Sequence, residues 1–299
     1  MTAGSIISGG FGLVRERPRA VAAWGLVYLL LTAAMGLLMI TQLGDRMVQL
    51  AGSPEAAVAA MGAMMGPMLL LNVLMFVVLI VLLTAAQRAV LQPERDRFFY
   101  MRLGMDELRM LGLGIFLVIL FYIGFLVAIL AAAAVAGLAA VAAGPVAGVL
   151  IGTPAMLAAF ALSVWVMTRL GLAFPLTLLR GRMVLWDSWR VTRGRFWSLF
   201  GGFLGVFVLL MVIFGIAGLV TSGGYFAALM RHGLTPEGMQ IAAQEQMAAQ
   251  FGSVDVMTVL RWIVTSVAGT IGIAVYGGAL GTAARELTDN IEEVSERFA

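Results

Sequence analysis

The densest gathering of side chains that could do chemistry lies in residues 186–197, which read WDSWRVTRGRFW. Three of the chain's six Trp and three of its nineteen Arg fall in this stretch. Guanidinium groups bind phosphate and carboxylate oxygens, while indole rings stack on bases or lie at the headgroup level of a membrane. The spacing therefore admits three kinds of site: an active site, a nucleic-acid interface or a membrane interface.

Composition removes most catalytic chemistry. The chain has no Cys and a single His, His232, which excludes thiolate metal sites, Cys nucleophiles and His-based triads. All nineteen basic residues are Arg, so lysine-dependent phosphate and Schiff-base sites are excluded too. Asp106 and Glu107 are adjacent and point in different directions on a helix, so they do not form a catalytic carboxylate pair. We expect no enzyme activity, no cofactor and no metal site.

The elements that position these residues are expected to be membrane helices. Of the 299 residues, 62% are hydrophobic and 12% charged, with a mean hydropathy of +1.01. Soluble domains carry roughly a quarter charged residues, so lipid is the expected solvent. We predict an all-α, polytopic transmembrane bundle with interfacial amphipathic helices. Apolar runs of spanning length lie at about 20–42, 66–88, 111–142, 146–174, 199–222 and 259–283.

The middle of the chain could hold two long spans or three short ones, and Gly144-Pro145 offers one clear break. Arg placement favours two, which makes six in all. With six spans, only Arg46, Arg231 and Arg261 lie opposite the other sixteen Arg, whereas seven spans would leave no bias. Because Arg collects in cytoplasmic loops, we predict a single membrane domain, 1–299, with both termini cytoplasmic.

Shorter elements are expected between the spans. Ser53-Pro54-Glu55 and Thr235-Pro236-Glu237 are helix-start patterns, which predict surface helices over 54–65 and 236–250. An Arg-bearing amphipathic segment followed by a hairpin of spans occurs three times, which suggests three loosely repeated hairpins.

The opening stretch reads best as an interfacial helix over 183–193 that Gly194 ends. Trp186, Arg190 and Arg193 share a face, and Asp187 is placed to pair with Arg190. Pinned between two spans, the stretch does not fit a nucleic-acid groove. The candidate headgroup and interfacial residues are Arg169, Trp186, Trp189, Arg190, Arg193, Arg195 and Trp197.

Three further features complete the pattern. Arg169 either extends its side chain to the interface or, if its helix runs past Pro175, faces the bundle as an anion ligand. In 94–109 the apolar side chains are expected to enter the interface while the Arg side chains stay in water. Small residues mark close helix packing in the last two spans. The packing glycines are Gly201, Gly205, Gly277 and Gly281.

Two stretches carry a family resemblance. The first is 169–175 (RLGLAFP), followed after a short gap by 187–197 (DSWRVTRGRFW), and the second is 99–109 (FYMRLGMDELR). They are similar to the six-helix membrane domains found with some glycerophosphoryl diester phosphodiesterases and to stand-alone bacterial inner-membrane proteins of the YciC type. The resemblance implies six spans in an inner membrane. It does not imply phosphodiesterase activity, which belongs to a separate soluble domain.

Together these patterns predict a non-enzymatic inner-membrane protein that acts as a scaffold or a lipid-contacting partner. The expected partners are anionic inner-leaflet phospholipid and a membrane protein or a second copy of the chain, with no nucleic acid. The alternative is a transporter or channel for a lipid or an amphipathic anion.

Overall fold

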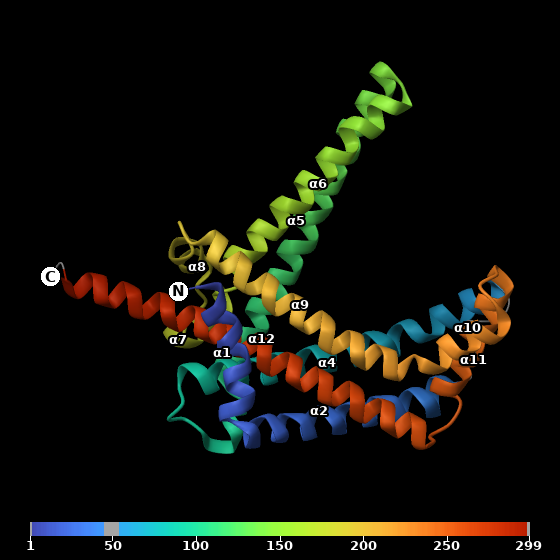
Figure 1. Ribbon diagram of the computed structural model, residues 1–299, viewed down its shortest axis with the longest axis horizontal. Helices are drawn as coiled ribbons and strands as arrows, with labels where there is room; N and C mark the ends of the chain where they lie inside the picture. The colour runs from blue at the N-terminus through green and yellow to red at the C-terminus, as the bar shows by residue number, and fades with distance from the viewer. Residues whose placement is uncertain (1, 45–53, 298–299) are drawn as a thin grey trace.

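The computed structural model describes residues 2–44 and 54–297. Within these ranges the chain forms helices and no strand, and six of the helical segments are long and apolar enough to cross a membrane (Figure 1). The predicted all-α polytopic fold is therefore confirmed. The α-helices are α1 (Ala3–Glu16), α2 (Pro18–Leu38), α4 (Pro54–Leu91), α5 (Met105–Ala143), α6 (Pro145–Leu170), α7 (Ala173–Arg180), α8 (Leu185–Val191), α9 (Phe196–Thr221), α10 (Gly223–His232), α11 (Pro236–Phe251) and α12 (Val256–Arg297). A π-helical turn, η1 (Met39–Leu43), extends α2, and a tight turn, η2 (Arg97–Tyr100), lies between α4 and α5.

The middle of the chain forms two spans. Gly144 has φ 88, a conformation that suits glycine, and Pro145 begins α6 directly after it. The fourth span was predicted over about 146–174. Helix α6 ends at Leu170, a turn follows at Gly171 and Leu172, and the apolar segment continues through α7 to Arg180.

The two predicted surface helices have different outcomes. A separate helix over 54–65 is wrong, because α4 runs without a break from Pro54 through Pro67 to Leu91. Pro67 is tolerated in this long apolar helix as it is in many membrane helices. Ser53 lies outside the described residues. The second prediction is confirmed: α11 begins at Pro236, and the Thr235 hydroxyl accepts a hydrogen bond from the Gly238 N–H at 3.1 Å.

Helix α12 forms the centre of the bundle. It packs against α1, α2, α4 and α9, and 67% of its most apolar stretch is buried, far more than in any other span of the described residues. Glycines permit this contact: a Cβ added at Gly277 would lie 2.6 Å from the Ala86 Cβ, and one at Gly281 would lie 3.0 Å from the Val90 Cβ. On α9, a Cβ added at Gly205 would collide with the Ile7 side chain, and one added at Gly201 would lie 3.5 Å from the Ala3 Cβ.

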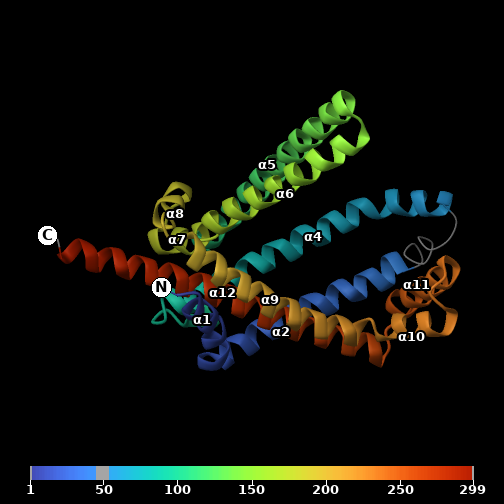
Figure 2. The same cartoon turned by 45° about the horizontal axis from the view of Figure 1, so that its top comes forward.

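The hairpin of α5 and α6 diverges from this bundle (Figures 1 and 2). Its two helices pack tightly on each other, since a Cβ at Gly148 would lie 2.7 Å from the Ala140 Cβ and one at Gly152 would lie 2.6 Å from the Ala136 Cβ. No such pairing joins α2 to α4, whose main common neighbour is α12. The three loosely repeated hairpins therefore differ in how their helices pack.

The bundle has two distinct ends (Figure 2). The α8 end carries α1, α7, α8 and turn η2, and the α11 end carries α10 and α11. The candidate sites lie at these two ends and in the wedge between the hairpin and the bundle.

Candidate functional sites at the two ends of the bundle

Arg169 is enclosed by two indole rings at the α8 end. Its guanidinium carbon lies 4.8 Å from the ring centre of Trp165 and 5.0 Å from that of Trp189. The two rings meet edge to face at 89°, with their centres 5.0 Å apart. Each cation–π contact contributes about 0.5–2 kcal/mol, with the higher values where water is excluded. Arg169 therefore links the last turn of α6 to α8.

Hydrogen bonds fix the same junction. The Ser188 hydroxyl donates to the Arg169 carbonyl oxygen at 2.6 Å, and the Thr192 hydroxyl donates to the Ser188 carbonyl oxygen at 2.8 Å. The half-buried Arg169 side chain donates one long bond, 3.5 Å, to the Trp189 carbonyl oxygen, and its Nε is buried without a partner in the described residues. The idea that α6 runs past Pro175 and turns Arg169 into the bundle is wrong, because α6 ends first.

The other predicted interfacial residues point outward. Trp186 and Trp197 are each 78% exposed, and Arg190 and Arg193 are exposed beside them. Arg195 is half-buried. The structure thus brings Arg169 and Trp189 together against α6 and leaves two rings and two guanidinium groups on the surface of the α8 end.

Two details of this segment differ from the sequence expectation. Helix α8 spans Leu185–Val191 rather than 183–193, and Gly194 (φ 79) lies in the turn after it. Asp187 pairs with Arg180, and at 3.9 Å with Arg182, instead of with Arg190. The cause is the turn at Gly181 (φ 60), which returns the chain so that Arg180 reaches the first turn of α8.

A buried ion pair lies nearby that sequence reasoning missed. Arg88, near the end of α4, is 1% exposed. Its Nη2 lies 2.6 Å from Glu107 Oε1 and its Nη1 donates to the Tyr100 carbonyl oxygen at 2.7 Å. Glu107 Oε2 accepts from the Gly104 N–H at 3.0 Å. The signal was an Arg at the end of the apolar run 66–88, which sequence reasoning had counted only toward the topology.

This ion pair supports a strained turn. Phe98, Phe99 and Tyr100 have φ of 51, 55 and 66, in the left-handed region that costs roughly 1–2 kcal/mol for each L-residue. The Trp24 indole N–H donates to the Phe99 carbonyl oxygen at 2.9 Å, and Arg17 contacts the Tyr100 hydroxyl. The exposed Phe98 still fits the predicted contact with the membrane interface. The network ties α2, α4 and α5 together, which is a structural role.

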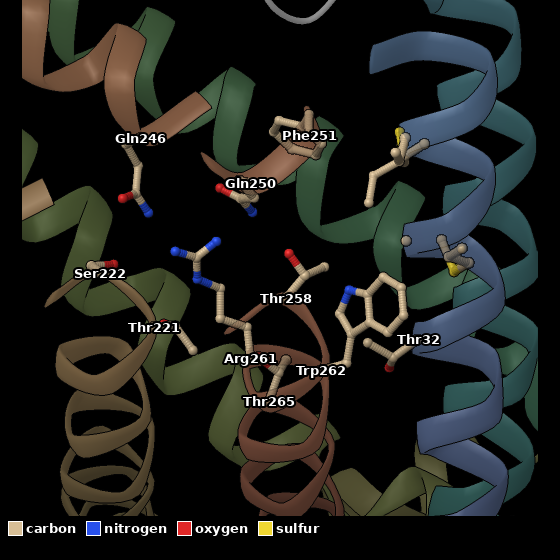
Figure 3. Close-up of a pocket in the computed structure, with 14 residues that line it drawn as sticks. Thr32, Thr221, Ser222, Gln246, Gln250, Phe251, Thr258, Arg261, Trp262 and Thr265 are labelled. Atoms are coloured by element: carbon tan, nitrogen blue, oxygen red, sulfur yellow. The ribbon is translucent and has the colours of Figure 1, made fainter. Parts of the chain in front are cut away.

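At the α11 end a polar pocket opens among α2, α9, α11 and α12 (Figure 3). Its volume is about 310 Å³, and Arg261 is the only charged side chain in its wall, as far as the described residues show. Sequence reasoning had counted Arg261 only toward topology. The lining residues are Thr32, Met35, Gly36, Met39, Ile40, Thr221, Ser222, Gln246, Gln250, Phe251, Thr258, Arg261, Trp262 and Thr265.

A larger cavity of about 570 Å³ lies in the wedge between the α5–α6 hairpin and the bundle. Its wall is largely aromatic and aliphatic, and includes Phe121 of α5, Phe160 of α6 and Phe203 of α9. Arg169 does not line it, because Arg169 and Trp165 lie on the opposite face of α6. Among the described residues no group of His, Asp and Glu side chains could hold a metal ion.

Comparisons of the chain with protein-family models, with curated proteins and with solved structures find no match. The resemblance to six-helix inner-membrane domains stays a prediction from its two Arg-bearing stretches.

Proposed function

We propose that this integral membrane protein is non-enzymatic and binds anionic phospholipid at its α8 end, where it acts as a lipid-contacting scaffold. The observation that carries the proposal is the pair of exposed Trp rings, Trp186 and Trp197, beside the exposed Arg190 and Arg193. Indole rings prefer the headgroup layer, and guanidinium groups bind phosphate there.

The internal contacts of α8 support a preformed site. Arg169, Trp189 and Ser188 hold α8 against the end of α6, so the exposed residues pay little conformational entropy when a headgroup binds. Asp187 is already paired with Arg180, which leaves Arg190 without a carboxylate partner in the described residues. We place the α8 end on the cytoplasmic side of a bacterial inner membrane, because sixteen Arg favour that side.

The test measures lipid retained by the purified chain. Nanodiscs that contain phosphatidylglycerol and phosphatidylcholine are dissolved in mild detergent, and bound lipid is counted by native mass spectrometry. Each Arg near an anionic surface contributes about 1 kcal/mol, so the double variant Arg190→Gln, Arg193→Gln is expected to lose about tenfold or more in phosphatidylglycerol retention.

A matched control removes two exposed charges from the other loop of the same end: Arg97→Gln, Arg102→Gln. We expect that variant to retain phosphatidylglycerol as the wild type does. Equal losses in the two double variants would mean general charge attraction and would contradict a site on α8.

A second candidate function, lipid transport, is favoured by the apolar cavity in the wedge. Its wall of Phe and aliphatic side chains suits an acyl chain, and the cavity lies between two parts of the fold that share few contacts. Proteoliposomes with fluorescent phospholipid in one leaflet test it. Exchange between leaflets that Phe121→Trp or Phe203→Trp slows would support transport, and exchange no faster than in protein-free vesicles would rule it out.

A further inference from the structure

The polar pocket at the α11 end has the side chains of a binding site, yet it lies far from the Arg and Trp residues of the α8 end (Figures 1 and 3). Thr, Ser and Gln side chains form much of its wall, and no carboxylate is among the lining residues. Pockets that hold small molecules start at roughly 300 Å³, so about 310 Å³ suits a small polar group.

Arg261 supplies the charge. One terminal nitrogen, Nη1, donates to the Ala249 carbonyl oxygen at 2.9 Å and so fixes the side chain against α11. The other, Nη2, makes no hydrogen bond in the described part of the chain. The Asp255 carboxylate accepts a hydrogen bond from the Thr258 N–H at 2.7 Å and does not line the pocket. The guanidinium therefore lines the pocket with N–H donors on Nη2 that are not used within the described residues.

Donors from α11 converge on the same space. Figure 3 shows the amide nitrogen of Gln246 turned toward the guanidinium of Arg261, with Gln250 beside it. The oxygen of the Gln246 amide is buried without a partner among the described residues, so no internal hydrogen bond explains this orientation. Hydroxyls of Ser222 and Thr258 lie around the same opening. The guanidinium and the two side-chain amides together offer N–H donors to one space that no carboxylate lines, which suits an oxyanion.

The depth of the pocket bears on where such an anion comes from. The apolar stretch that begins in α2 ends at Ile40 of η1, and α9 ends at Thr221; both residues line the pocket. The pocket therefore lies where the spans leave the hydrocarbon layer, at the level of phospholipid phosphates. The same place is open to small anions from the aqueous phase.

We propose that this pocket binds a phosphate group, with Arg261 as its charged donor and Gln246 and Gln250 as amide donors. The group is either a free phosphate compound or the headgroup of a phospholipid in the leaflet at the α11 end. The site goes beyond the lipid contact proposed for α8 and is independent of it, because the two sites share no residue.

The test uses the full chain in detergent micelles, titrated calorimetrically with inorganic phosphate and with sn-glycerol 1-phosphate. A second arm measures phosphatidylglycerol retained from nanodiscs by native mass spectrometry, in a protein whose α8 site carries Arg190→Gln and Arg193→Gln. Saturable binding of a soluble probe identifies a free phosphate compound as the ligand, and retention of lipid alone identifies the headgroup. If neither probe binds, the proposal is wrong.

Three variants separate the pocket from its surroundings. Arg261→Gln is expected to weaken phosphate binding at least about tenfold, since it removes a charge-assisted hydrogen bond. Because it also removes the bond to Ala249, Gln246→Leu serves as a second variant that keeps that bond, and it should weaken binding several-fold. Arg231→Gln, at the same end but paired with Glu245 outside the pocket, should leave binding unchanged. Wild-type affinity in both pocket variants would overturn the assignment.

Discussion

At the scale of single residues, charge is used in two different ways. Arg88 and Glu107 are buried and fully engaged, whereas Arg190, Arg193 and Arg261 keep donors free for something outside the chain. A buried ion pair contributes little net stability compared with apolar packing, but breaking it by removing one partner is costly. Burial, and not the residue type, therefore separates the structural Arg88 from the arginines that we propose as binding residues.

Glu107→Gln tests the buried pair. The change keeps the shape of the side chain but leaves Arg88, within the described residues, with only Asp106, 3.7 Å away, as a carboxylate partner. We expect a loss of about 3 kcal/mol or more in the free energy of unfolding, because the buried Arg88 charge loses its close carboxylate partner. Thermal or denaturant unfolding in micelles, followed by circular dichroism, measures it. Asp106→Asn, at a half-exposed carboxylate, should cost less than about 1 kcal/mol.

At the scale of elements, small residues decide which helices approach each other. Helix α12 meets α4 through Gly277 and Gly281 and meets α1 through Gly278, where an added Cβ would lie 2.9 Å from the Gly9 carbonyl oxygen. In a membrane, where apolar surface gains nothing from leaving lipid, such close backbone contact is a main source of helix association.

Gly277→Val is therefore expected to destabilise the bundle by about 1–3 kcal/mol or more, since the added atoms collide with Ala86 and Leu83. The matched control is Gly215→Ala on α9, where an added Cβ meets nothing within 4 Å. That change should be neutral or stabilise the helix by up to about 1 kcal/mol. Unfolding midpoints of the two variants in one detergent give the comparison, and equal midpoints would refute the packing role of Gly277.

The pairing of α10 with α11 is expected to depend on pH. Glu245 accepts from His232 at 2.9 Å and pairs with Arg231, and the hydrogen bond to His232 lowers the pKa of its carboxyl below the usual 4.5. A lowered carboxyl pKa means that the pairing is fully formed above the unfolded value and is lost as the pH falls through the folded one. Hydrogen exchange of the α10 and α11 amides should therefore rise, after correction for intrinsic rates, below about pH 4.5. Glu245→Gln should exchange faster at neutral pH and show a smaller change on acidification.

At the scale of the whole molecule, the bundle places its proposed lipid site and its proposed phosphate pocket at opposite ends. The α5–α6 hairpin leans away from the bundle (Figure 2). Only 6% of the most apolar stretch of each of its two spans is buried, so its apolar side chains are largely exposed. A hairpin of this kind fits lipid or a partner membrane protein, including a second copy of the chain.

The orientation of the whole molecule is testable because the chain has no Cys. Met183→Cys lies at the α8 end and Leu234→Cys between α10 and α11, and both positions are exposed. In intact spheroplasts, a membrane-impermeant maleimide should label position 234 and leave position 183 unlabelled until the membrane is broken. Labelling of position 183 alone in intact cells would mean the reverse orientation.

The sequence by itself determined the class of protein and the order of its helices. Apolar runs of spanning length, the Gly144-Pro145 break and the Thr235-Pro236-Glu237 start are local signals, and each acts within a few residues of its effect. The hypothesis of an Arg and Trp cluster near 186–197 came from the same local patterns. The pattern at Pro54 was ambiguous. It was interpreted as a separate surface helix over 54–65, but these residues are the first part of the long helix α4.

Only the tertiary structure decided which charges are buried and which are free. Arg88 meets Glu107 across 19 positions of sequence, and Arg261 reaches the α11 backbone 12 positions away. Asp187 forms its ion pair with Arg180 and not with Arg190, because the turn at Gly181 folds the chain back. These pairings depend on where helices cross, which is set by close packing of small residues over the whole bundle and leaves no periodic trace in the sequence.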